Sequence, residues 1–248
     1  MITIENLVKS FDNHRVLDNL NLTIPKGKMT AIIGRSGEGK SVLLKSIIGL
    51  MQPTSGSISI DGQEVTTLTE RERAIIYKKC GYVFQFAALL DSLNVFENVG
   101  LTLLESGMTP EDVLPIVTEK LSLVQLSTDI LKKYPMDLSG GMRKRVGIAR
   151  TLITNPSIIL YDEPTTGLDP ITSHVVHQLM ADMQKRFEVT SVIISHDPEV
   201  FKFTDYVALL HEGNIKFFGE ASSIWESDNP YIYQFIRGLT QGPIQADI

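Results

Sequence analysis

A glycine-rich loop of the form G-x-x-x-x-G-K-S runs from Gly34 to Ser41 and constrains the fold of this chain more than any other segment. A β-rich run at 30–33 precedes the loop, and apolar residues suited to a buried helix follow it at 40–50. Strand, glycine loop and helix in this order gather backbone N–H groups and a helix N-terminus around one point. The segment therefore predicts a nucleotide triphosphate site within an α/β domain.

The loop contains the groups that a triphosphate requires. Its glycines allow backbone donors to turn inward, Lys40 is expected to reach the β- and γ-phosphates, and the Ser41 hydroxyl is expected to ligate Mg²⁺. We expect the nucleotide to contact the whole segment, namely Gly34, Arg35, Ser36, Gly37, Glu38, Gly39, Lys40, Ser41 and Val42. A chance match in a glycine-rich turn is disfavoured, because the flanking strand and helix are those that the motif requires.

Length and composition limit the remaining possibilities. The 248 residues, 43% of them hydrophobic, allow one large α/β domain or one domain with a smaller inserted lobe. No apolar run approaches the roughly 20 residues that cross a bilayer, and no secretory leader opens the chain, so we expect a cytosolic protein. A formal charge of −6 argues against general binding to nucleic acid. The single cysteine, Cys80, is given no role.

Strand and helix patterns alternate along the chain. Short β-rich runs at 2–8, 20–24 and 57–60 open it, and helical periodicity dominates 95–155, which predicts an inserted helical lobe. The runs at 157–161 and 191–194 are typical of central parallel strands, with a crossover helix at 174–187 between them. A hairpin of strands 207–210 and 215–218 and a helix from Asn229-Pro230 to Gly238 are expected to end the fold.

Acidic side chains follow one of the predicted central strands. Asp162 and Glu163 come at its carboxyl end, where open α/β sheets bind ligands. Asp162 suits the Mg²⁺ shell, and Glu163 suits orienting or deprotonating the attacking water. His196 follows the strand at 191–194, so we expect it at the same sheet edge, near the γ-phosphate. The other four histidines lack that placement, and His174 and His177 are interpreted as a surface helix face.

A second glycine segment, Ser139-Gly140-Gly141, precedes a helix that extends through Arg150. A serine N-cap with two glycines exposes backbone donors for a phosphate, although a simple capped helix explains it equally. The basic residues of this helix are interpreted as its solvated face; they are Arg143, Lys144, Arg145 and Arg150.

The whole set of motifs resembles the ATP-binding cassette family over nearly the full chain. The residues that carry the resemblance are Gly34 to Ser41, Gln85, Leu138 to Met142, Asp162-Glu163, Gly167-Leu168-Asp169 and His196. The resemblance implies a P-loop NTPase with a mainly parallel central sheet, an N-terminal antiparallel β-subdomain and an inserted helical subdomain. It implies a single ATPase domain, with its core and β-subdomain at 1–94 and 157–225, the helical subdomain at 95–156 and a C-terminal helix and tail at 226–248.

The resemblance also implies two cassettes arranged head to tail. ATP would lie between the glycine loop of one copy and Ser139, Gly140 and Gly141 of the other, with Lys40, Glu163 and His196 as catalytic groups. Phe11 falls where the family stacks an aromatic ring on adenine. Gln85 falls where the family senses Mg²⁺ and the membrane partner, and Asp169 where the two cassettes communicate.

Three details are similar to the cassettes of Mla- and MCE-type lipid transporters. These are the segment from Gln85 to Val95, a signature that ends in Met142 rather than Gln, and the tail from Gln234 through Ile244. That similarity implies a membrane permease, an MCE substrate-binding protein and sometimes a small STAS-domain protein as partners. The cassette would then lie at the cytoplasmic face of the inner membrane, held there through the permease. The tail from about Tyr231 would contact either the opposite cassette or its own domain.

Two classes of function therefore stand. The first is the motor of a membrane transporter for phospholipid or another lipid, or for another solute. The second is a soluble assembly or scaffold ATPase of the iron–sulfur type, since the apolar segment 84–96 suits either kind of partner. A GTPase is disfavoured because no N-K-x-D motif occurs in the chain, and cassettes of translation or DNA repair usually carry two cassettes or long insertions.

Overall fold

A computed structural model describes residues 1–12 and 14–245, so the last three residues of the predicted tail at 226–248 lie outside the described part. The strands are β1 (Ile2–Phe11), β2 (His14–Ile24), β3 (Met29–Ile33), β4 (Ser55–Ile60), β5 (Gln63–Glu64), β6 (Cys80–Val83), β7 (Ile158–Asp162), β8 (Thr190–Ile194), β9 (Tyr206–His211) and β10 (Asn214–Glu220). The α-helices are α1 (Lys40–Ile47), α2 (Glu70–Lys79), α3 (Val95–Glu105), α4 (Pro110–Leu123), α5 (Gly140–Leu152), α6 (Pro170–Phe187) and α7 (Pro230–Arg237). Short 3-10 helices cover Thr128–Ile130, Pro135–Asp137, Pro198–Phe203 and Ala221–Glu226.

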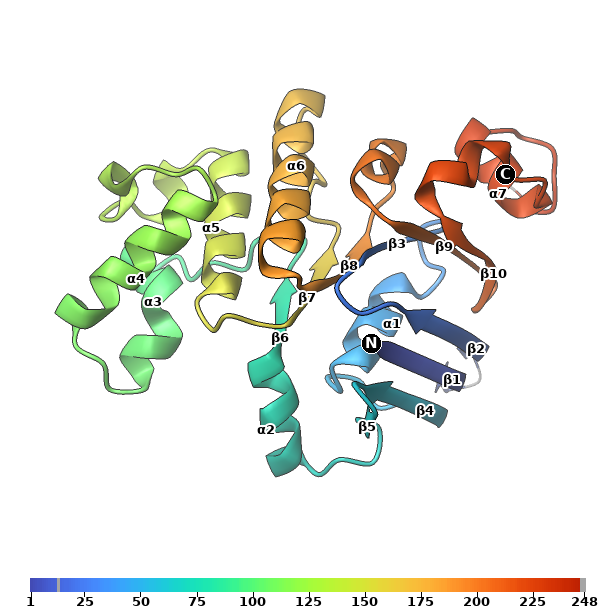
Figure 1. The fold of residues 1–248 in the computed structure, drawn as a ribbon, viewed down its shortest axis with the longest axis horizontal. Coiled ribbons are helices and arrows are strands. Elements are labelled where there is room, and N and C mark those ends of the chain that lie inside the picture. Colours follow the sequence, from blue (N-terminus) through green and yellow to red (C-terminus); the bar gives the residue numbers. More distant parts are fainter. Residues whose placement is uncertain (13, 246–248) are drawn as a thin grey trace.

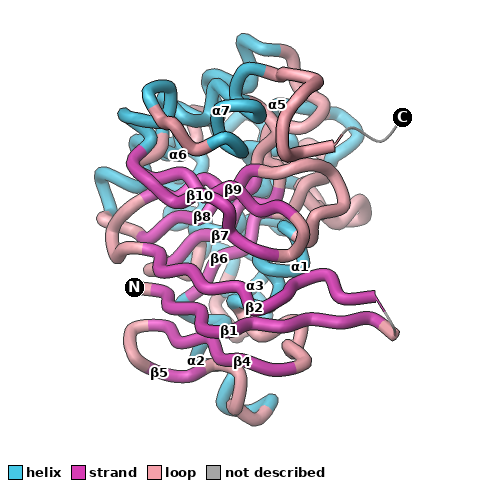
Figure 2. The backbone as a smooth tube through the Cα atoms, turned by 90° about the vertical axis from the view of Figure 1, so that its right-hand side faces the viewer, coloured by secondary structure: helices cyan, strands magenta, loops and turns pink. Residues whose placement is uncertain are grey.

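The strands form two sheets (Figures 1 and 2). The smaller sheet has the order β2-β1-β4-β5 and is antiparallel, and the larger has the order β10-β9-β3-β8-β7-β6. In the larger sheet only β10 runs antiparallel to its neighbour, so five adjacent strands are parallel. This arrangement confirms the predicted fold class, a mainly parallel central sheet beside an N-terminal antiparallel sheet.

Alternation along the central strands divides the core into two clusters. Met29, Ala31 and Ile33 of β3 face a cluster that includes residues of α3, α5, α6 and α7. Ile32 of the same strand faces the other cluster, where α1 and the antiparallel sheet pack. Because successive side chains of a strand point to opposite faces, a continuous apolar run signals a sheet that is covered on both sides. The predicted central strands therefore form as expected.

The stretch between β6 and β7 is helical, as its periodicity predicts. Helices α3, α4 and α5 occupy most of it and lie together at one end of the molecule (Figure 1). Capping residues fix where two of these helices begin. Asn94 and Glu97 form a reciprocal capping box for α3, and Thr109 caps α4 with Pro110 at its first position.

Helix α2 and the first half of β2 are not predicted by the sequence patterns. Helix α2 buries only Ile76, so it has no apolar stripe that periodicity could reveal. Its start has a recognisable signal nevertheless, because Thr69 and Glu72 form a capping box. The helix after the glycine loop also ends earlier than predicted, at Ile47, and Gly49 then takes a left-handed conformation with a φ of 76°.

The C-terminal tail folds back onto helix α7. The side-chain amide of Gln234 accepts from the Ile244 backbone N–H at 2.7 Å and donates to the Ile244 carbonyl at 2.8 Å. The Arg35 guanidinium then donates to the Gln245 carbonyl at 2.5 Å. Within one chain, the described part of the tail therefore packs on its own domain and reaches the glycine loop.

Candidate active site

A cavity of about 380 Å³ lies above the carboxyl ends of the central strands. It is lined by His14, Val16, Ser36, Gly37, Gly39, Lys40, Ser41, Val42, Glu163 and His196. The glycine loop joins β3 to α1, Glu163 follows β7, and His196 follows β8. Because parallel strands end at one edge of the sheet, the fold brings together groups that are far apart in the sequence.

Lys40 is buried at the start of α1, with its ammonium group turned into the loop. It donates to the Gly34 carbonyl at 2.8 Å and to the Arg35 carbonyl at 2.5 Å. Burial lowers the pKa of Lys40 to about 8, against the opposing effect of nearby carboxylates, of which Glu163 contributes most. The lysine is therefore a cation that has been taken out of water and that an anion in the cavity would stabilise.

Asp162 is held at both of its carboxylate oxygens. The Ser41 hydroxyl donates to Oδ1 at 2.9 Å, and the Tyr82 hydroxyl donates to Oδ2 at 2.7 Å. Burial and the bond to Asp162 raise the pKa of Tyr82, so its hydroxyl keeps its proton. Tyr82 is not among the site residues that the sequence predicts, and its only signal is a polar tip on β6, the strand next to β7.

Glu163 accepts three side-chain hydrogen bonds. Gln85 Nε2 and Thr166 Oγ1 donate to Oε2 at 2.8 and 2.9 Å, and Nε2 of His196 lies 2.7 Å from Oε1. The backbone N–H of Glu163 donates to the Ile194 carbonyl at 3.1 Å, which ties the end of β7 to the end of β8. The residue has a left-handed φ of 49°, a conformation that costs energy for a side chain other than glycine.

The segment Ser139-Gly140-Gly141 lies elsewhere. Ser139 caps α5, since its Oγ accepts from the Met142 backbone N–H at 3.2 Å. A Cβ placed on Gly141 would come within 2.6 Å of Thr172, so this segment packs against the start of α6, which Asp169 caps. Among the described residues, those that line the Lys40 cavity include neither Ser139 nor the two glycines.

The sequence predicts a solvated face for the basic residues of α5, but only Arg143 is exposed. Lys144 is buried and donates to the Gln85 carbonyl, and Arg150 donates to the carbonyls of Ala88 and Ala87 at 2.7 and 2.9 Å. Arg143 and Arg145 likewise donate to backbone carbonyls. These long side chains satisfy loop carbonyls that have no partner in a helix or strand, and Lys144 and Arg150 thereby hold the segment from Gln85 to Ala88.

The two histidines of α6 do not form the surface face that the sequence predicts. His177 is fully buried and its Nε2 lies 3.4 Å from the Thr165 hydroxyl, so His174 and His177 do not form a surface face. The described residues contain no cluster of three potential metal-ligating side chains from His, Cys, Asp and Glu.

Phe11 is exposed at the end of β1, opposite His14, and does not itself line the cavity. Burial raises the pKa of the Cys80 thiol to about 12, in keeping with an inert cysteine.

Two residues of the glycine loop turn away from the cavity. Arg35 contacts the C-terminal tail, and Glu38 contacts His211 at the end of β9, with 2.8 Å between Oε1 and Nδ1. The other four histidines are expected to lack the placement of His196, yet two of them approach the site: His14 lines the cavity, and His211 contacts the glycine loop. The position of His211 at the end of an apolar strand is the sequence signal for this contact.

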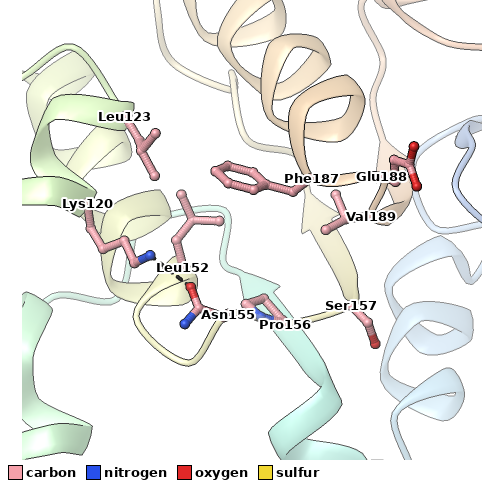
Figure 3. A pocket seen from close by; sticks show the side chains of 9 residues that line it. All are labelled: Lys120, Leu123, Leu152, Asn155, Pro156, Ser157, Phe187, Glu188 and Val189. Carbon is pink, nitrogen blue, oxygen red and sulfur yellow. Dashed lines mark hydrogen bonds between the residues drawn. The ribbon is translucent and has the colours of Figure 1, made fainter. Parts of the chain in front are cut away.

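A second cavity, of about 280 Å³, lies at the opposite ends of β7 and β8 (Figure 3). Apolar side chains dominate its lining, and the buried Lys120 donates to Asn155 there at 2.8 Å. It contains no carboxylate paired with a histidine and no glycine loop. Chemistry therefore assigns the candidate active site to the cavity around Lys40.

This chain is similar in sequence to known transport proteins. A family model described as "ABC transporter" matches residues 17–166. The "Probable ribonucleotide transport ATP-binding protein mkl" of Mycobacterium tuberculosis is 40% identical over 98% of this chain and 68% of its own length. The "Intermembrane phospholipid transport system ATP-binding protein MlaF" of Haemophilus influenzae is 36% identical over 99% of this chain and 93% of its own.

A solved structure shares the fold. The dimeric post-hydrolysis state of the ATP-binding cassette MJ0796, bound to ADP and Pi, superposes with a TM-score of 0.82 and is 33% identical. The match covers 89% of this chain and 99% of that one. No helix in the described ranges is long and apolar enough to span a membrane.

Proposed function

The chain belongs to the ABC transporter family, and from this premise we propose that it is the ATP-hydrolysing motor of a transporter that moves phospholipid or another lipid. Hydrolysis of ATP follows from the family and from the related cassette bound to ADP and Pi. The observation that supports assignment of the chemistry to particular residues is the convergence of Lys40, Asp162, Glu163 and His196 on one sheet edge. We therefore propose the roles of the individual site residues, lipid as the transported substrate and the identity of the partner proteins.

In this proposal the glycine loop and Lys40 bind the triphosphate. The backbone N–H groups between Gly37 and Ser41 lie at the N-terminus of α1, where the helix dipole favours an anion. Lys40 exchanges its two carbonyl partners for phosphate oxygens, which are stronger acceptors for an ammonium group. Phe11, exposed at the end of β1, is free to stack on the adenine ring.

Glu163 acts as the general base. Its carboxylate takes a proton from water as the water oxygen bonds to the γ-phosphorus and the bond to the bridging oxygen of ADP breaks. An ionised carboxylate only accepts hydrogen bonds, so His196 donates through Nε2 and holds the base in position. Water reaches the base once one of the three donors around Glu163 moves away. Among these donors, Gln85 belongs to the apolar segment 84–96, where we propose that the membrane permease binds.

Mg²⁺ fits the donors around Asp162. Ser41 Oγ and Asp162 Oδ1 are hard oxygen ligands 2.9 Å apart, and Gln85, whose Nε2 donates to Glu163, also carries an amide oxygen. When bound, the ion would neutralise charge on the β- and γ-phosphates. Tyr82 holds the second oxygen of Asp162, so the carboxylate keeps one orientation toward Ser41.

A second copy of the chain completes the site in this proposal. Ser139, Gly140 and Gly141 lie outside the Lys40 cavity of their own chain, yet the serine and glycines at the start of α5 can bind a phosphate. A head-to-tail dimer would bring them to the nucleotide of the partner, and the related cassette was solved as a dimer. Asp169 adjoins this segment through the start of α6, where it can transmit changes between copies.

The membrane partner would bind beside Gln85. Three large apolar side chains are exposed there, namely Phe84 at 40%, Phe86 at 82% and Leu90 at 46%. Large apolar side chains that lie together on a surface indicate a site for a partner. Arg150 and Lys144 connect this surface to α5, and Gln85 connects it to Glu163. A permease bound there would localise the chain at the cytoplasmic face of the inner membrane.

Lipid is the substrate class that we favour. The phospholipid transport relative matches across 93% of its own length, and the segment from Gln85 to Val95 is similar to that subfamily. An MCE substrate-binding protein and a small STAS-domain protein would then complete the complex. The 40% identity to a ribonucleotide transport protein keeps a motor for another solute as the second candidate.

Purification from detergent-extracted membranes tests the proposal. The chain carries an affinity tag, and the permease, the MCE protein and phospholipid are sought in the eluate by mass spectrometry. A membrane-extracted complex whose ATPase activity rises with phospholipid supports a lipid motor. Stimulation by another solute would favour the second candidate, and a complex made only of soluble assembly proteins would contradict a transporter.

A further inference from the structure

Glu38 introduces a carboxylate into the loop that is expected to bind phosphate. It lies between Gly37 and Gly39, whose positive φ values of 84° and 92° curve the backbone around the cavity. A carboxylate facing a triphosphate would weaken binding, because like charges at short range repel. In the described structure Glu38 does not line the cavity, although its charge still acts on Lys40.

The carboxylate is instead held by the end of β9. His211 Nδ1 lies 2.8 Å from Glu38 Oε1, and the Glu212 backbone N–H donates to Oε2 at 2.6 Å. The Glu38 and His211 side chains are only 12% and 7% exposed. Since the ionised carboxylate cannot donate, the imidazole supplies the proton of this hydrogen bond.

The support for His211 is rigid and independent of Glu38. The Leu210 carbonyl lies so close to the loop that a Cβ on Gly34 would come within 2.3 Å of it. The turn after β9 is fixed on its other side, where the Asp18 backbone N–H donates to the Gly213 carbonyl at 2.9 Å. The Tyr231 ring of α7 lies 5.8 Å from the imidazole, measured between ring centroids. His211 is therefore a fixed point against which the loop residue is aligned.

We propose that His211 is a positioning residue for nucleotide binding, which holds the Glu38 carboxylate away from the phosphates. Without the imidazole, the Glu38 carboxylate keeps, among the described residues, only the hydrogen bond from the Glu212 backbone N–H and is able to turn toward the cavity. There it would repel the phosphates and compete for Lys40. The pair also links the glycine loop to α7 through Tyr231, so the C-terminal helix contributes to the stability of the nucleotide site.

Equilibrium binding of Mg-ADP to the full chain tests this role, because ADP is not consumed. We expect His211→Leu to weaken ADP binding at least about fivefold, whereas Glu38→Gln binds ADP as tightly as the unmodified chain or more tightly. The double variant Glu38→Gln/His211→Leu should return to within about twofold of the unmodified affinity. His211→Asn, whose amide can replace the Nδ1 donor, should bind nearly normally.

The double variant separates the two possible roles of His211. If the imidazole merely supports the loop, then removing the charge of Glu38 rescues nothing, and a double variant as weak as His211→Leu overturns the proposal. Unchanged binding by His211→Leu overturns it as well. Glu38→Asp gives a test that leaves His211 intact: its shorter carboxylate cannot reach Nδ1, so it should bind ADP more weakly than Glu38→Gln. Equal binding by these two variants would also contradict the proposal.

Discussion

Oε1 of Glu163 and Nε2 of His196 lie 2.7 Å apart, although 33 positions separate the two residues in the sequence. The pair joins the carboxyl ends of β7 and β8, and the backbone of Glu163 is bonded to Ile194 at the same point. Each side chain is fixed by a different strand, so the proposed base is already oriented before nucleotide binds. This preorganisation reduces the reorientation that the chemical step requires.

Glu163→Gln should abolish turnover and leave ATP binding intact. The amide keeps the size of the side chain and can still bond to its neighbours, but it cannot take a proton from water. We expect the ATPase rate of the purified complex to fall by about 10²- to 10⁴-fold, as for loss of a general base. Steady-state phosphate release measures the rate, and ATP-dependent dimer formation on a sizing column measures binding. Glu199→Gln, an exposed glutamate paired with Lys202, is the control, and near-normal hydrolysis by Glu163→Gln would count decisively against the assigned base.

Tyr82→Phe should raise the Mg²⁺ concentration that nucleotide binding requires. The change removes the 2.7 Å hydrogen bond to Asp162 Oδ2 and leaves the ring in its contact with Phe84. Loss of one charge-assisted bond of about 1.5 kcal/mol corresponds to roughly a tenfold rise in half-saturating Mg²⁺. Thermal denaturation in ATP, titrated with Mg²⁺, gives a readout that does not depend on turnover. The half-exposed Tyr77 of α2 provides a matched Tyr77→Phe control, and equal Mg²⁺ titrations for the two variants would argue against this role.

ATP affinity should decrease as pH rises above about 8. Burial lowers the pKa of Lys40 to about 8, so the free protein loses this proton at a pH where an ordinary lysine is still charged. Phosphate favours the charged form, so binding raises this pKa again and takes up a proton. Calorimetry in buffers of different ionisation enthalpy should detect that uptake between about pH 7.5 and 9. Lys40→Arg cannot lose its charge and should bind without uptake, and a wild-type affinity that stays flat across this range would contradict the assignment.

Arg150→Met should destabilise the chain without weakening nucleotide binding. It removes two donors from the carbonyls of Ala87 and Ala88, which both adopt left-handed conformations after Gln85. Losing these two bonds, of which the one to Ala87 is partly buried, should lower the free energy of unfolding by about 2 to 3 kcal/mol. Urea denaturation measures the change, with Arg145→Met, which removes contacts to a different loop, as the control. An unfolding free energy equal to that of the unmodified chain would show that solvent replaces these contacts.

Local sequence patterns anticipated much of the fold because its central strands are apolar on both faces. Runs such as 157–161 and 191–194 can be satisfied only between two layers, and the glycine loop fixes the order of strand and helix around it. Helix α2 was missed because it contacts the core through little more than Ile76, so burial left no periodic trace in its sequence. Lys144 and Arg150 of α5 depart from the predicted solvated face for a different reason, because in the sequence a charged side chain that pairs with a distant carbonyl resembles a solvated one.

The sequence by itself determined the type of site, because the glycine loop, Asp162-Glu163 and His196 each occur at the end of a recognisable strand. Only the tertiary structure decided how those groups are held. It placed Tyr82 on the free oxygen of Asp162, Thr166 on Glu163 and His211 on Glu38, and it turned Arg35 toward the C-terminal tail. These contacts join segments whose sequence separation has no fixed period, and they depend on which strands lie side by side. A pattern along the chain specifies the local secondary structure of its own segment. The partners of a side chain are set by how separate segments pack against one another.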